Sequence, residues 1–196
     1  MSVSDWIKAY EHKLPHWAES RIPSPLAAQL LQILDKKKGN NILEIGVGNG
    51  RDCIFFAKEG NVVTGIDVVS KAIDVAKTNA EAEGADHIQF LVENAEKLSF
   101  QDESFDAVYS VSVLHATNLN LSLKELSRVL KIGGKAMVYL YEKTISDGRE
   151  FWFRKREDVE KLLKDFNLSI KDKWDVVHTG HENEKTTVLI YKLQKI

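Results

Sequence analysis

Short apolar runs alternate along the chain with stretches in which apolar residues recur every three or four positions. The runs are rich in β-branched residues, which is typical of buried strands, whereas the second spacing places apolar side chains on one face of a helix. The pattern predicts five successive strands in NILEIGV, NVVTGIDVV, HIQFLVEN, FDAVYSVSVL and KAMVYLY. It predicts helices in RDCIFFAKEG, in KAIDVAKTNAEAEG with Ser70 as its N-cap, and in LSLKELSRVL.

The two ends of the chain differ from this central rhythm. All prolines lie before residue 26, so residues 1–25 are expected to form an irregular or short-helical leader. From Leu26 a helix is predicted to run into the lysines of DKKKG, with Gly39 as its stop. After the fifth strand we expect a charged helix in REDVEKLLKDF and an antiparallel pair in LSIKDKWDVV and TTVLIYKLQ, joined by HTGHENEK.

This order of elements predicts the fold class. Strands that alternate with helices require a mostly parallel sheet covered on both faces, and right-handed crossovers restrict it to a doubly wound topology. We therefore expect an α/β, Rossmann-like fold: a doubly wound, mostly parallel seven-stranded sheet with an antiparallel C-terminal strand. The domain is predicted to span residues 26–196, with residues 1–25 as a leader that caps it.

Composition narrows the classes of partner. The formal net charge is −2, and no basic face is indicated, so nucleic acid is not an expected partner. Cys53 is the only cysteine, which excludes an internal disulfide framework and suits a reducing cytoplasm. No apolar run approaches the ~18 residues that a membrane helix needs. We expect a cytoplasmic protein that acts on a small molecule.

The turn after the first strand carries the main functional signal. It has glycine at every second position, Gly46, Gly48 and Gly50, which lets backbone N–H groups approach a ligand at the carboxyl ends of the strands. Asp67 ends the second strand, where a carboxylate can accept hydrogen bonds from ribose hydroxyls. A dinucleotide fingerprint needs Gly or Ala where Arg51 stands, which disfavours a nicotinamide dehydrogenase.

The spacing G-x-G-x-G, with Glu44 two residues ahead, resembles motif I of the class I S-adenosylmethionine (SAM) dependent methyltransferases. The resemblance covers residues 26–196 and implies SAM as the cofactor, with S-adenosylhomocysteine (SAH) as the product. Within the family, GNGRDCIFFAKEGNVVTGID after RIPSPL is most similar to the small-molecule branch of tellurite-resistance-type and thiol methyltransferases. In that branch a proline-bearing leader covers the cofactor.

The resemblance also implies a role for individual positions. Glu44 and the glycine loop would meet the aminoacyl end of SAM, Asp67 would hold the ribose, and Asn94 would meet the adenine amino group. The end of the fourth strand would face the sulfonium. The implied cofactor-binding residues are Glu44, Gly46, Val47, Gly48, Gly50, Asp67, Val68, Asn94, Ala95, Ser110 and Val111.

The acceptor side has fewer signals. A thiolate, selenide or tellurium oxyanion needs no general base, whereas an alcohol or protonated amine does. His115, just past the fourth strand, is the candidate base, and a packing histidine is the alternative. Trp17 and Arg21 in the leader and Tyr141 after the fifth strand are candidate substrate contacts. His178 and His181 are interpreted as a solvated hairpin tip, and no metal site is expected.

Four function classes remain open at this point. The favoured class is a SAM-dependent methyltransferase that moves a methyl group to a thiol, chalcogen or similar small molecule by in-line displacement. The alternatives are an RNA or protein methyltransferase, a module that binds SAM without turnover, and a nicotinamide dehydrogenase. The acceptor's identity and the oligomeric state are not predicted.

Overall fold

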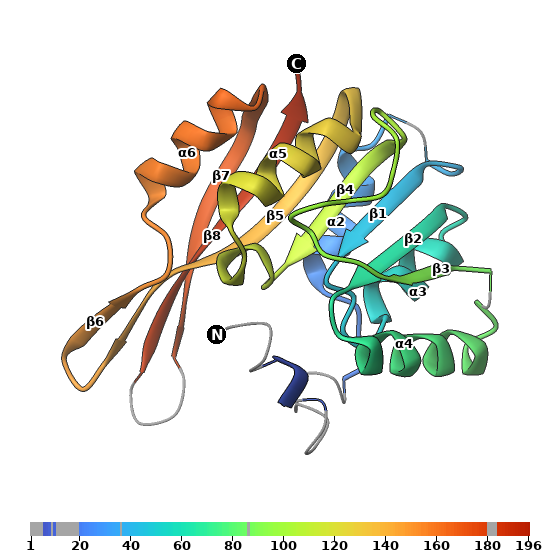
Figure 1. The fold of residues 1–196 in the computed structure, drawn as a ribbon, viewed down its shortest axis with the longest axis horizontal. Coiled ribbons are helices and arrows are strands. Elements are labelled where there is room, and N and C mark those ends of the chain that lie inside the picture. Colours follow the sequence, from blue (N-terminus) through green and yellow to red (C-terminus); the bar gives the residue numbers. More distant parts are fainter. Residues whose placement is uncertain (1–5, 9, 11–19, 36, 86, 180–183) are drawn as a thin grey trace.

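One mixed sheet organises the chain. The computed structural model describes residues 6–8, 10, 20–35, 37–85, 87–179 and 184–196. Its eight-stranded sheet has the order β3-β2-β1-β4-β5-β8-β7, with β6 paired to β5 (Figure 1). The strands are β1 (Asn41–Ile45), β2 (Val62–Asp67), β3 (Gln89–Val92), β4 (Phe105–Val111), β5 (Leu130–Ser146), β6 (Arg149–Trp152), β7 (Leu168–Thr179) and β8 (Lys185–Lys195).

The first five strands are parallel, and the last pair is antiparallel, as predicted. β1 pairs in parallel with both β2 and β4, so it lies at the centre of the parallel part. β8 runs antiparallel to β5 and to β7. Because parallel strands point the same way, the ends of β1, β2 and β4 meet at one edge of the sheet. The glycine turn and Asp67 are therefore brought to the same edge.

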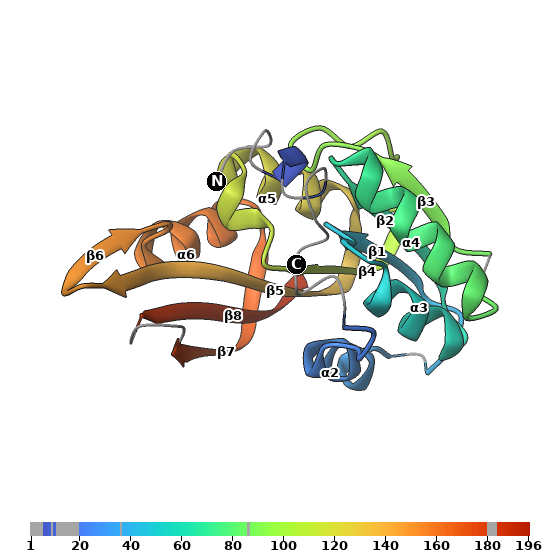
Figure 2. The ribbon, with the colours of Figure 1, turned by 90° about the horizontal axis from the view of Figure 1, so that it is seen from below.

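Helices cover both faces of the sheet, as a doubly wound fold requires. The helices α2 and α3 lie on one side, and α5 and α6 lie on the other (Figure 2). Two apolar clusters fill these layers: Leu30 and Phe56 belong to the first, and Leu123 and Leu163 to the second. The helices are α2 (Pro25–Ile33), α3 (Arg51–Lys58), α4 (Ser70–Ala82), the 3₁₀ helix η2 (Leu114–Ala116), α5 (Leu119–Val129) and α6 (Arg156–Asp165).

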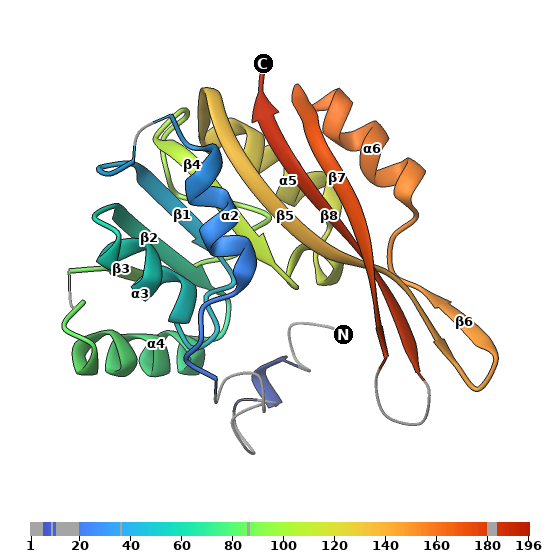
Figure 3. The same ribbon diagram turned by 180° about the vertical axis from the view of Figure 1, so that it is seen from behind.

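Two helix ends differ from the sequence predictions. The helix α2, which crosses β5 in Figure 3, ends at Ile33, where Leu34 takes an extended conformation and packs on the core. Lys37 and Lys38 are therefore outside the helix, and Gly39 (φ +73°) redirects the chain into β1 instead of stopping α2. Ser70 is the first residue of α4 and not its N-cap, because Val69 takes that position and its carbonyl accepts the N–H groups of Ala72 and Ile73.

The sheet also extends further than predicted. The segment KIGG precedes the predicted fifth strand KAMVYLY in the sequence. It does not form a separate turn but lies inside β5, where the pairing with β4 shifts register. Beyond the predicted end of this strand, β5 continues to Ser146 and turns back as β6, which pairs Lys143 with Trp152. An arm projects past the helices (Figure 1). It consists of β6, which makes the sheet eight-stranded, and the ends of β5, β7 and β8. No helix in the described ranges is long and apolar enough to cross a membrane.

Candidate functional site

The glycine turn is a backbone cradle that larger residues would obstruct. Gly46, Gly48 and Gly50 all have positive φ, at +80°, +55° and +79°. A Cβ on Gly46 would lie 2.1 Å from Cγ2 of Val113, and one on Gly50 would lie 2.9 Å from Cβ of Ala76. Left-handed backbone and close approach therefore both require glycine at positions 46 and 50. The N–H groups of Gly46 and Val47 both donate to the Ile66 carbonyl, and that of Gly50 donates to the Val47 carbonyl.

Asp67 braces this cradle from the end of β2. Its Oδ2 accepts a hydrogen bond from the Gly48 N–H at 3.1 Å, and its Oδ1 accepts one from the Val69 N–H at 3.0 Å. Burial raises the pKa of Asp67, and these backbone hydrogen bonds oppose that rise. A carboxylate has about four lone-pair sites, so Asp67 can accept further hydrogen bonds from a ribose. Val68, beside it, is partly buried.

Tyr10 was not anticipated from the sequence and lies at this cradle. It is buried, at 6% exposure, against Val69 and Ala72. A Cβ on Gly48 would lie 3.3 Å from the Tyr10 hydroxyl oxygen, which places this side chain against the loop. Burial, followed by the charge of Asp67, raises the pKa of Tyr10 to about 12. Its spacing of four from Trp6, which packs in the same cluster, was the available signal.

Glu44 lies beneath the cradle in a buried acidic group. Burial raises the pKa of Glu44 well above its usual range, and the neighbouring Asp52 raises it further, whereas hydrogen bonding with Cys53 lowers it. Among the described residues, its Oε2 atom is buried and has no hydrogen-bond partner. Asp52 itself accepts from the Ser24 N–H at 2.7 Å and from the Tyr109 hydroxyl at 3.2 Å. This network joins the start of α2 to the glycine loop.

The ends of β3 and β4 complete the edge. Asn94 is exposed, and its Oδ1 accepts the Glu96 N–H at 2.9 Å, while Ala95 is buried. Ser110 is fully buried, and its hydroxyl donates to the Ile45 carbonyl at 3.3 Å, so its side chain links β4 to β1. Val111 is partly buried. The Ser110 hydroxyl is therefore engaged within the sheet and does not face a ligand.

His115 and Tyr141 meet just beyond this edge. Their rings stack at 4.2 Å between centroids, and the Phe153 ring packs edge-on against His115 at 5.7 Å. Burial, followed by the charge of Arg154, lowers the pKa of His115 to about 4, so the imidazole is neutral at pH 7. In the described part of the chain, its Nδ1 atom is buried and has no hydrogen-bond partner. Arg154 was not identified as a site residue from the sequence.

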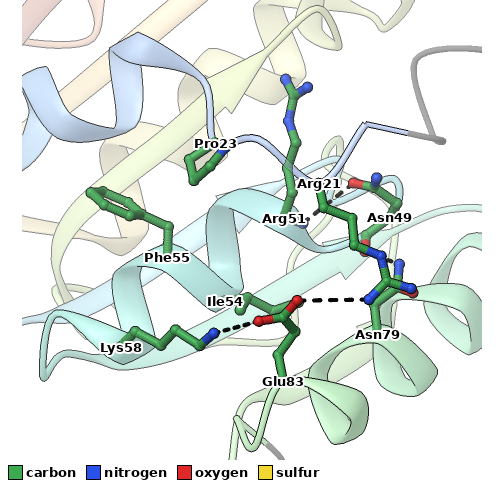
Figure 4. Close-up of a pocket in the computed structure, with 9 residues that line it drawn as sticks. All are labelled: Arg21, Pro23, Asn49, Arg51, Ile54, Phe55, Lys58, Asn79 and Glu83. Atoms are coloured by element: carbon green, nitrogen blue, oxygen red, sulfur yellow. Dashed lines mark hydrogen bonds and ion pairs between the residues drawn. The ribbon is translucent and has the colours of Figure 1, made fainter.

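Arg21 is separated from this group. It lines a pocket of about 170 Å³ between α3 and α4 and pairs with Glu83 at 3.7 Å (Figure 4). That volume is below the ~300–1,000 Å³ typical of small-molecule sites, and Glu83 is already shared with Lys58. Arg51 lines the same pocket and lies 3.5 Å from Asp52. In Figure 4 the Arg51 side chain points away from Glu83 and Lys58.

Of the two histidines near the last hairpin, one lies within the described residues. His178 lies within β7, not at the hairpin tip, and is 3.1 Å from the Tyr139 hydroxyl through its Nε2 atom. His181 and Trp17 lie outside the described residues. Within the described ranges, no three His, Cys, Asp or Glu side chains are grouped as metal ligands.

The residues gathered at the carboxyl edge of β1, β2, β3 and β4 define a nucleoside-binding Rossmann-like domain. Two features fit an aminoacyl nucleoside: the Oε2 of Glu44, which has no partner among the described residues, and the spare acceptor capacity of Asp67. The family profile described as "Methyltransferase domain" matches residues 43–138, which contain this edge. Residues 43–138 therefore belong to the methyltransferase domain family, which supports class I SAM-dependent methyltransferase activity with SAM as the cofactor.

Similar proteins support this membership. An uncharacterised protein of Methanocaldococcus jannaschii is 33% identical over 76% of this chain and 68% of its own length. The ubiquinone/menaquinone biosynthesis C-methyltransferase UbiE of Zymomonas mobilis is 32% identical over 58% of this chain. The chain spans 48% of the length of UbiE and of the methyltransferase GfsG of Streptomyces halstedii.

Solved structures share the fold. The geranyl diphosphate C-methyltransferase of Streptomyces coelicolor, solved with SAH, superposes with a TM-score of 0.73 over 87% of this chain and 77% of that chain. The [4+2]-cyclase SpnF also gives 0.73, over 87% of this chain and 80% of that chain. Their sequence identities are 16% and 18%, so they bear on the fold alone.

Proposed function

We propose that this protein transfers the methyl group of SAM to a thiol, chalcogen or similar small molecule held beside His115 and Tyr141. The single observation that carries the proposal is the buried, neutral imidazole of His115, whose Nδ1 has no partner among the described residues. It lies against aromatic rings just past the end of β4. An unpartnered buried acceptor favours a ligand that donates a hydrogen.

The roles that we propose at the cofactor seat rest on the resemblance, and the contacts of Asp67 support them. We assign the ribose hydroxyls to Asp67, the adenine to Val68, Asn94 and Ala95, and the aminoacyl end to the glycine loop. Glu44 would meet that end only as a neutral acid, because its pKa is raised well above the usual range by burial. The remaining proposed contacts are Gly46, Val47, Gly48, Gly50 and the backbone of Ser110 and Val111.

SAM supplies an activated methyl group, so the chain's own residues have only to orient the acceptor and exclude water. The Tyr141 and Phe153 rings exclude water around His115. With a pKa of about 4, His115 is a weak base. A thiol, with an ordinary pKa of about 8.5, gives its proton to such a weak base more readily than an alcohol does. This supports a thiol acceptor, and Nδ1 is the atom that would receive its proton.

The test is a panel of acceptors incubated with labelled SAM: aromatic and aliphatic thiols, selenite, tellurite, the matching alcohols, and total RNA. We expect label in thiols or chalcogen compounds. The variant His115→Phe keeps the ring stack and removes the base, so it should lose about 100-fold or more in kcat for a thiol at pH 7. The kcat of this variant should recover as the pH rises above the pKa of the thiol.

The matched control is His87→Phe, because His87 is exposed on the turn before β3. It should methylate the same acceptors as the unmodified chain. Label found only in RNA or in protein would contradict the proposal. The net charge of −2 and the buried single cysteine, Cys53, support the further proposals of a small-molecule partner and a cytoplasmic location.

A further inference from the structure

Arg154, which the proposed chemistry leaves without a role, lies beside the proposed acceptor position. It follows β6 directly, and one Nη atom donates to the carbonyl of Phe153 at 2.7 Å. The other Nη atom donates to the carbonyl of Thr117, which caps η2, the helix that carries His115. The guanidinium is thereby fixed against two of the three segments that form the aromatic group, the third being β5 with Tyr141. Hydrogen bonds to backbone carbonyls, and not an ion pair, therefore fix the position of the Arg154 guanidinium.

These contacts leave the guanidinium incompletely satisfied. It has five N–H donors, and the carbonyls of Phe153 and Thr117 accept two of them. Its Nε atom is buried and has no acceptor among the described residues. Burial lowers the pKa of Arg154, which shows that water only partly compensates the charge. The side chain as a whole is partly exposed, so a solute can reach it.

The neighbouring cations differ from Arg154 in having carboxylate partners. Arg156, two residues further, lies 3.2 Å from Asp175 and 3.8 Å from Glu142. Lys143, on the adjoining part of β5, lies 2.6 Å from Glu150. No carboxylate within the described ranges forms an ion pair with Arg154. A partly buried cation without a counter-ion is costly, and an anion supplied from outside would remove that cost.

The aromatic rings define the shape of what would lie there. The stacked pair His115 and Tyr141 and the Phe153 ring surround the segment next to the guanidinium. Flat rings favour flat ligands through stacking and edge-to-face contact. We propose that the acceptor is a planar molecule carrying a carboxylate, which Arg154 binds while His115 faces the methyl-accepting atom. This inference rests on the proposed function and specifies its substrate class.

The test compares two probes that differ only in the carboxylate, 2-mercaptobenzoate and thiophenol. Titration of each into the SAH-loaded protein measures acceptor binding without requiring turnover. We expect 2-mercaptobenzoate to bind about tenfold to hundredfold more tightly, because a hydrogen bond to a charged group is worth a factor of this size. Arg154→Gln should abolish this preference and leave thiophenol binding unchanged. Arg154→Lys should keep part of it, since the charge remains.

Arg156→Gln is the matched control, because it removes a neighbouring guanidinium that already has acidic partners. It should retain the full preference for 2-mercaptobenzoate. Equal binding of the two probes by the unmodified protein, or a preference that survives in Arg154→Gln, would overturn the inference. A folded Arg154→Gln variant is recognised by unchanged SAH binding. Failure of the unmodified protein to bind SAH would instead count against the proposed function.

Discussion

At the scale of single residues, burial decides the ionisation of the side chains at the proposed site. His115 is 7% exposed, and burial and the charge of Arg154 lower its pKa to about 4. The pKa of Asp67, which is an acid, shifts in the opposite direction, because burial raises it. In both cases the neutral form gains relative to the charged form. The site therefore favours neutral groups and has one prominent exception, the Arg154 cation.

The shifted pKa of His115 predicts acid sensitivity of the fold. Above a pH of about 6.5 the imidazole is neutral in both states and contributes nothing. Below that, the unfolded chain binds a proton that the folded chain binds only near pH 4, so stability falls as the pH falls. The loss should reach about 3 kcal/mol at pH 4. Urea unfolding between pH 7 and pH 4 measures it.

The variant His115→Phe isolates this effect, since phenylalanine cannot bind a proton and can still stack on Tyr141. Its free energy of unfolding should fall less between pH 7 and pH 4 than that of the unmodified chain. His87→Phe, a substitution of the same kind at an exposed position, is the comparison variant. An identical acid-side slope in His115→Phe would show that His115 is not the group responsible.

At the scale of elements, the sequence pattern predicted those strands and helices whose burial has a clear period. The parallel strands and the glycine turn belong to this group. The strand β6 was missed although Asp147 and Gly148 both have positive φ, at 50° and 73°, and DG is the residue pair that such two-residue hairpins prefer. All of β6 is exposed, so no apolar alternation marked it. The end of α2 was missed because tertiary packing of Leu34 overrode helical spacing.

The glycine loop allows strain and close approach to be separated. Gly46 and Gly39 have nearly the same φ, +80° and +73°, but a Cβ on Gly46 would lie 2.1 Å from Val113, whereas one on Gly39 would meet nothing within 4 Å. Gly39→Ala should therefore cost about 1 kcal/mol for the left-handed backbone alone. Gly46→Ala should cost about 1–3 kcal/mol more, because Val113 has to move. Thermal unfolding of the two variants measures the difference.

Cofactor binding gives a second readout for the same pair of variants. Gly46→Ala should weaken SAH binding at least tenfold, because Val113 and the loop can no longer take their native positions. Gly39→Ala should bind SAH normally, since Gly39 lies at the opposite end of β1 from the loop. Equal stability and equal SAH affinity in the two variants would contradict the close-approach role of Gly46.

At the scale of the whole molecule, the cofactor seat could be predicted from the sequence and the acceptor site could not. The glycine loop and Asp67 are separated by a single helix and strand, and their spacing is a local pattern. By contrast, the group around His115 is assembled from η2, β5 and the segment after β6, which are brought together by the packing of β4 on β5. No spacing in the chain indicates that Phe153 and Arg154 approach His115. A local sequence pattern predicts such contacts only when the contacting residues lie on one helix or strand.

The fold as a whole predicts which nucleoside will stabilise it. A ligand that binds only the folded state raises the free energy of unfolding by about 2.7 kcal/mol at 100 times its Kd. For a chain of this size each kcal/mol raises Tm by about 2–4 °C. SAM or SAH at that concentration should therefore raise Tm by about 5–11 °C. NAD should not, because Arg51 occupies the position that dinucleotide turns leave to Gly or Ala.

Asp67→Ala tests whether this stabilisation arises at the proposed seat. It removes the two hydrogen bonds from Gly48 and Val69, so the free chain should itself be less stable. The deciding quantity is therefore the rise in Tm on adding SAH, compared within each variant, and Asp67→Ala should lose most of that rise. Asp74→Ala, an exposed acid on α4, should keep it. Stabilisation by NAD as large as that by SAH would remove the cofactor assignment, whereas SAH stabilisation that survives in Asp67→Ala would leave the cofactor in place and move its ribose away from the end of β2.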